Sequence, residues 1–87
     1  MKKHILKIWP EYFKDVESGR KPFEVRKDDR NFQVGDILEL MEFDPTEIED
    51  YEPVGYMGNS ITKEITYKLE GGSFGVEKGF CVLGIRS

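Results

Sequence analysis

Apolar and polar residues alternate over several short segments of the chain, a pattern typical of half-buried β-strands. In residues 3–8 the alternation puts His4, Leu6 and Ile8 on one face, which we expect to be buried. Residues 37–43 carry apolar side chains on both faces, which predicts a central strand covered on each side. The predicted strands are residues 3–8, 23–27, 37–43, 61–69 and 80–85.

A helical period appears between the first two predicted strands. Pro10 suits the first position of a helix, where its missing N–H would have no partner in any case. Gly19 is a natural stop just past the end of that helix. The apolar residues at i, i+3, i+4 and i+7 are Trp9, Tyr12, Phe13 and Val16. Such a stripe indicates packing against the core, but Trp9 and Tyr12 lie where strand and helix meet and stay candidates for stacking on a ligand.

The segment 44–60 breaks the alternation, because it combines prolines and glycines with a run of acids and shows no period. It predicts an acidic loop longer than the ~12–15 residues usual in a compact domain, either a lid over a ligand or a linker. After it, we expect Ile61, Ile65, Tyr67 and Leu69 to face inward. These elements predict a single α+β domain over residues 1–87: a small, partly closed β-barrel of about five strands with one or two short helices.

Charge and cysteine content narrow the classes of function. The net charge is −4, and five of the acidic residues lie in residues 44–52. A strong basic field for long-range attraction to DNA is therefore absent, while a small-ligand pocket or a weak contact with single-stranded RNA stays compatible. The acidic segment 44–52 is itself a candidate contact for a protein partner. With one cysteine, Cys81, no secretory leader and no membrane-spanning apolar stretch, we expect a cytoplasmic domain.

The sequence gives little support for a metal site or for a catalytic triad built on serine or cysteine. One cysteine and one histidine do not supply the four ligands of a structural zinc site, so we predict no metal and no cofactor. The serines have only His4 as a conventional base. Because His4 lies on the better buried face of the first strand, it is better interpreted as a hydrogen-bonded structural residue than as a catalyst.

The chemically richest segment is the one around residues 19–30, where cations surround a single glutamate. In an extended strand Phe23 and Val25 point to one face and Glu24 and Arg26 to the other. Lys21 lies just upstream and is held extended by the proline that follows it. An exposed ion pair between these charges would contribute only ~0–1 kcal/mol.

Two functional interpretations of this cluster stay open beside that structural one. In a binding site, Lys21 and Arg26 would hold a phosphate or a base edge, and Glu24 would accept from an exocyclic amine. Trp9 or Tyr12 would then stack on the base, and Lys7 would be nearby if the first strand borders the second. In a hydrolase, Lys21 would abstract a proton or stabilise an oxyanion while Glu24 shuttles protons.

Gly19, Lys21, Glu24 and Arg26 match the signature Gly-x-Lys-x-x-Glu-x-Arg, so the chain resembles the ASCH domains, a branch of the PUA-like superfamily. The helix opened by Pro10 and the turn at residues 34–36 also follow the order of that family. The resemblance covers nearly all of the chain. It implies a PUA-like β-barrel with the helix against one side, and RNA binding, which is generally proposed for these domains.

One small bacterial branch of the same family is an amidohydrolase that acts on acylated cytidine nucleosides, which would make Lys21 and Glu24 catalytic. That branch carries Thr at the place of Glu24 and a further carboxylate on a helix that has no counterpart in this sequence. Three alternative functions are therefore considered, in order of preference. They are binding of RNA or a nucleotide-like ligand, hydrolysis of an acylated cytidine, and protein interaction through the acidic segment.

Overall fold

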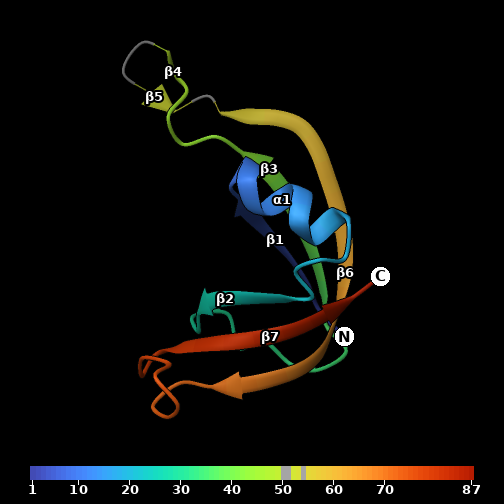
Figure 1. Cartoon of the computed structure of the whole chain (residues 1–87), viewed down its shortest axis with the longest axis vertical. Helices are drawn as coiled ribbons and strands as arrows, with labels where there is room; N and C mark the ends of the chain where they lie inside the picture. Colours follow the sequence, from blue (N-terminus) through green and yellow to red (C-terminus); the bar gives the residue numbers. More distant parts are fainter. Residues whose placement is uncertain (50–51, 54) are drawn as a thin grey trace.

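The computed structural model describes residues 1–49, 52–53 and 55–87. Within these residues it contains one helix and a strongly curled sheet of five strands that forms a half-barrel (Figure 1). The expected mainly β fold with a short helix is thereby confirmed. The elements are β1 (Lys3–Ile8), α1 (Pro10–Glu17), β2 (Phe23–Lys27), β3 (Ile37–Phe43), β4 (Ile48–Glu49), β5 (Glu52–Pro53), β6 (Tyr56–Glu70) and β7 (Phe80–Arg86).

The sheet has the order β1-β3-β6-β7-β2, so the first two strands of the sequence lie at its opposite edges. β1 and β3 are parallel, whereas the other neighbours in this sheet are antiparallel. The long strand β6 pairs with β3 over residues 56–64 and with β7 over residues 64–70. Because β6 changes partner along its length and bends, the sheet curls back on itself (Figure 1).

The helix begins and ends where local chemistry predicts. Pro10 occupies its first turn, and Gly19, with a φ of +83°, turns the chain just after it. The apolar stripe divides, however. Phe13 and Val16 are buried against the sheet, while Trp9 and Tyr12 remain about half exposed. The helix therefore attaches through its C-terminal half and presents aromatic rings at its N-terminal end.

The expected loop 44–60 is wrong in its last part, because residues 56–60 belong to β6. Tyr56 pairs with Phe43 and Ser60 with Met41, with an irregularity in register between Met41 and Phe43. Residues 56–60 are all exposed, so no alternation of apolar and polar side chains marks them as a strand. Backbone pairing with β3, which leaves no trace in the hydrophobic pattern, extends the strand here.

The expected inward orientation of Tyr67 and Leu69 is also wrong. A β-bulge lies between Ile65 and Tyr67, and the extra residue shifts the alternation by one position. Ile65 is fully buried before the bulge, whereas Tyr67 is 66% exposed after it. Lys68 consequently turns inward, where its Nζ lies 3.0 Å from Asp28 Oδ2 and donates to the backbone O of Phe32 at 3.2 Å.

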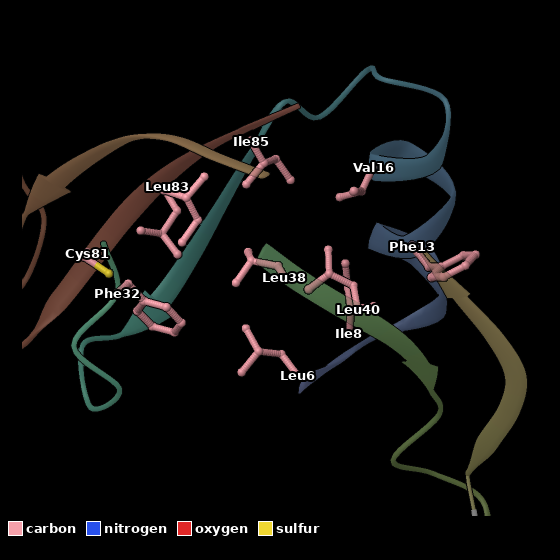
Figure 2. Packing of buried hydrophobic residues seen from close by; sticks show 11 residues of the cluster. Leu6, Ile8, Phe13, Val16, Phe32, Leu38, Leu40, Cys81, Leu83 and Ile85 are labelled. Carbon is pink, nitrogen blue, oxygen red and sulfur yellow. The ribbon is translucent and has the colours of Figure 1, made fainter. Parts of the chain in front are cut away.

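The core fills the concave side of the half-barrel and receives side chains from the helix, from four strands and from one connection. Figure 2 shows Phe13 and Val16 of α1 near Leu38 and Leu40 of β3. Phe32, in the connection between β2 and β3, reaches the same cluster. The buried members are Leu6, Ile8, Phe13, Val16, Phe32, Leu38, Leu40, Ile65, Cys81, Leu83 and Ile85.

Asp36 ties the start of β1 to the turn before β3. Its Oδ1 accepts from the backbone N–H of Lys2 at 3.0 Å, and its Oδ2 lies 2.9 Å from His4 Nε2. The backbone N–H of Gln33 also donates to Oδ2, at 3.1 Å. His4 is buried and packs edge-on against the ring of Phe32, a placement that agrees with the structural interpretation of this histidine.

These hydrogen-bond donors to Asp36 make the stability of the fold sensitive to acid. The Lys2 N–H first, and then the hydrogen bonds from His4 and Gln33, lower the pKa of Asp36 from 3.8 to about 2, against the opposing effect of burial. Because the pKa of Asp36 is lower in the folded state than in the unfolded state, its carboxylate stabilises the fold above about pH 4. This stabilisation is lost as the pH falls towards 2. We expect the urea midpoint to fall over this window, and to fall less steeply in Asp36→Asn. Equal slopes in both proteins would contradict the assignment.

No helix among the described residues is long and apolar enough to span a membrane.

Candidate functional site

The two edges of the curled sheet are joined by arginine side chains. Arg26 on β2 donates from Nη2 to the backbone O of Lys7 on β1, at 2.8 Å. Arg30 donates from Nη1 to the backbone O of Ile5, at 3.3 Å. Lys7 and Trp9 were expected near the charged cluster if the first two strands were neighbours. They are near it, but across the opening of the half-barrel, because these strands are its two edges.

Glu24 is the centre of this opening. Its side chain is directed inward and the residue is only 3% exposed. Lys21 Nζ donates to Oε1 at 2.7 Å, and Arg26 approaches Oε2 with Nε at 2.9 Å and Nη2 at 2.8 Å. Both carboxylate oxygens are thus engaged, and the three side chains form a hydrogen-bonded cluster with a net charge of one positive unit.

The inward direction of Glu24 puts the apolar side chains of β2 on the outside. Phe23 and Val25 are exposed, while the charged residue between them is buried. An isolated buried carboxylate would be strongly unfavourable, but the two cations that flank Glu24 in the sequence compensate its charge. The strand therefore alternates as expected, with the charged face turned towards the opening.

Aromatic rings form the other wall of the opening. Trp9 and Tyr12 stack with their ring centroids 6.0 Å apart and their planes at 20°. The Nζ of Lys21 lies 5.1 Å from the centroid of Tyr12 and 5.2 Å from that of Phe23, within the range of cation–π attraction. The backbone N–H of Lys21 donates to the O of Asp15 at 2.9 Å, which brings this lysine to the end of α1.

Lys7 contributes in a different way. Its backbone O accepts from Arg26, while its Nζ lies 4.4 Å from the ring centroid of Phe43 and 5.6 Å from that of Tyr56. The Phe43 and Tyr56 rings themselves meet edge to face. The ammonium group of Lys7 therefore packs against aromatic rings outside the Glu24 cluster. It forms no ion pair with Glu24.

All six residues predicted from the sequence line one pocket of about 620 Å³ between β1, α1 and β2. Sequence reasoning missed three further lining residues. Ile8 was predicted only as a buried residue of the first strand, and Phe23 and Val25 were missed because alternating apolar residues in a strand normally mark the buried face. The signal that could have identified Phe23 and Val25 is the flanking of Glu24 by cations, which favours burial of the charged face. The full lining is Lys7, Ile8, Trp9, Tyr12, Lys21, Phe23, Glu24, Val25 and Arg26.

A smaller pocket of about 390 Å³ adjoins Trp9 and reaches Asp44 and Thr46. The hydroxyl and then the backbone N–H of Thr46 hydrogen-bond to Asp44 and lower its pKa. The predicted protein-contact segment 44–52 includes residues 50–51, which lie outside the described residues. Over the described part of the chain, no group of three or more His, Cys, Asp or Glu residues is placed to hold a metal ion.

The profile of one protein family, described as a domain of unknown function (DUF3850), matches residues 3–85 of the chain. The matched span runs from the first residue of β1 almost to the end of β7, so it includes every residue that lines the larger pocket. No curated protein matches the chain.

Proposed function

The chain belongs to the DUF3850 family, a family of unknown function, and we propose from the pocket that it binds a nucleotide unit, either free or within single-stranded RNA. One observation carries the proposal. Lys21 and Arg26 are fixed on the buried Glu24 directly beside the stacked rings of Trp9 and Tyr12. A nucleotide offers the matching groups, an anionic phosphate and a flat base.

The charged cluster is suited to an anion because Glu24 uses only part of the donor capacity around it. An ammonium group carries three N–H donors and a guanidinium five. Lys21 donates once to Glu24, which leaves donors that can be directed towards a phosphate. We infer that Glu24 positions the two cations, instead of accepting from a base amine as the sequence suggested, since both its oxygens are occupied.

The aromatic wall supplies the second half of the recognition. Trp9 and Tyr12 are about half exposed, and a base stacking on either ring would bury apolar surface that is now in water. The volume of the pocket lies within the usual range for small-molecule sites, ~300–1,000 Å³. The resemblance of Gly19, Lys21, Glu24 and Arg26 to ASCH domains supports the same proposal, and with it a PUA-like barrel.

Hydrolysis of an acylated cytidine is the second candidate. The observation that favours it is the 2.7 Å contact between Lys21 Nζ and Glu24 Oε1 on the pocket wall, which would let a proton pass between the two groups. In this function the carbonyl of the acyl group would lie against Lys21. Release of acetate from acetylated cytidine would distinguish an enzyme from a binding domain.

An amide-detected NMR titration with cytidine monophosphate, acetylated cytidine and hexacytidylate RNA tests both functions in the same samples. We expect shifts at Lys7, Trp9, Lys21 and Arg26, and an approximately tenfold increase in Kd for Trp9→Ala because one stacking ring is lost. Lys21→Ala should weaken the phosphate-bearing ligands more than acetylated cytidine.

The control is Phe74→Ala, which removes a ring that is 89% exposed and lies outside the pocket lining. It should bind like the wild type. No shifts with any of the three ligands would overturn the proposed function, and a growing acetate signal would replace binding with hydrolysis.

A further inference from the structure

The outer face of β2, β7 and β6 carries a row of exposed apolar residues. In the register of these strands Phe23 lies opposite Gly84, and Gly84 lies opposite Tyr67. Phe23 is 41% exposed, and Tyr67 is more exposed still. Two aromatic rings are therefore presented to solvent from β2 and β6, the two strands that flank β7, on a sheet whose other face packs into the core.

Gly84 keeps the backbone between these two rings free of any side chain. A Cβ at this position would lie 3.0 Å from Thr66 Oγ1 and 3.3 Å from Tyr67 Cβ. The neighbouring row of the same face is apolar as well, with Val25 opposite Val82 and Val82 opposite Leu69. Exposed aromatic and aliphatic residues on one sheet face form a surface on which flat bases can stack.

A cation borders each end of this face, and the one on β7 is already paired with a carboxylate. Lys27 follows Val25 on the same side of β2 and is exposed. Arg86 lies at the other end of β7 on the same side as Gly84, and its Nη2 lies 3.5 Å from Glu64 Oε1. Between these two ends, the described residues of the two rows carry no acidic side chain.

The face is continuous with the pocket, because Phe23 and Val25 belong to both. We propose that the ligand is a single-stranded RNA that leaves the pocket across β2 and stacks further bases on Phe23 and Tyr67. This inference rests on the proposed function and specifies it: the preferred ligand is an oligonucleotide, of which the pocket holds one unit. Tyr67 then contacts only the part of the RNA outside the pocket.

The test compares Kd values for cytidine monophosphate and hexacytidylate in the wild type, Tyr67→Ala, Tyr67→Phe and Trp9→Ala. The wild type should bind the hexamer more tightly than the mononucleotide. Tyr67→Ala should raise the Kd for the hexamer about tenfold and leave the mononucleotide unchanged, because a stacking ring is lost only outside the pocket. Tyr67→Phe keeps the ring and should bind the hexamer like the wild type. Trp9→Ala should weaken both ligands.

Three outcomes would overturn the inference, and they differ in what they leave standing. If Tyr67→Ala binds the hexamer normally while Trp9→Ala weakens both ligands, the RNA does not cross this face but the pocket keeps its function. If neither ligand binds the wild type, the proposed function fails as well. If sedimentation shows self-association that Tyr67→Ala abolishes, and hexamer affinity is unchanged, the face belongs to a second copy of the chain.

Discussion

Replacing Glu24 with alanine is expected to lower the free energy of unfolding by about 3–5 kcal/mol, because it leaves two partly buried cations without their shared partner. Lys21 and Arg26 both donate to this carboxylate, and Arg26 also joins the two edges of the half-barrel through the backbone O of Lys7. Loss of the carboxylate should therefore loosen the opening as well as the strand. Urea unfolding followed by tryptophan fluorescence measures the change, since Trp9 lies at this site.

Two further variants make the expectation specific to the buried cluster. Glu24→Gln keeps the shape and one acceptor oxygen, so it should retain more stability than Glu24→Ala while still weakening nucleotide binding. Glu64→Ala is the matched control, because Glu64 forms a longer, exposed contact of 3.5 Å with Arg86. It should change stability by less than about 1 kcal/mol. Equal losses for Glu24→Ala and Glu64→Ala would show that burial gives the Glu24 cluster no special weight.

The elements that sequence predicted best are those that depend on local chemistry. Pro10 and Gly19 bound the helix whatever surrounds it, and alternation in residues 3–8 needs only one buried face. The bounds of β1, β2 and β3 were predicted correctly for this reason. The start of β6 and the bulge before Tyr67 depend on pairing with distant strands, and the hydrophobic pattern carries no record of that pairing.

The residues of the candidate site divide in the same way, into those placed by local chemistry and those placed by the rest of the fold. Glu24 and Arg26 are two residues apart on β2, so the alternation of a strand is enough to put them on one face. Lys21 precedes the strand and is held beside them by the backbone hydrogen bond from its N–H to the O of Asp15. Lys7, Trp9 and Tyr12 join this cluster because the sheet curls and brings its two edge strands close together. From the sequence, Lys7 was expected nearby only if the first strand bordered the second. The exposure of Phe23 and Val25 was missed because it depends on the neutralisation of Glu24 by the cations on both sides of it, which the alternation of apolar residues does not reveal.

Phe32 is the clearest case of a core residue that sequence reasoning overlooked. It follows the polar stretch 27–31 and lies in no strand or helix, yet it is only 1% exposed. Asn31 adopts a positive φ of 50°, a conformation that asparagine tolerates better than most residues, at the step that precedes the buried ring. The backbone O of Phe32 accepts from Lys68, and its ring meets the His4 imidazole, so it joins β1, β6 and the β2–β3 connection.

Phe32→Ala is accordingly expected to lower the free energy of unfolding by about 3–5 kcal/mol, since it removes a fully buried ring and leaves a cavity in the core. Phe74→Ala is the matched control: it deletes the same ring from the exposed hairpin between β6 and β7 and should stay within about 0.5 kcal/mol of the wild type. Phe32→Leu, with a smaller loss, keeps the comparison measurable if the alanine variant does not fold. Urea midpoints for the three variants measure the differences, and similar midpoints for Phe32→Ala and Phe74→Ala would place the Phe32 ring outside the core.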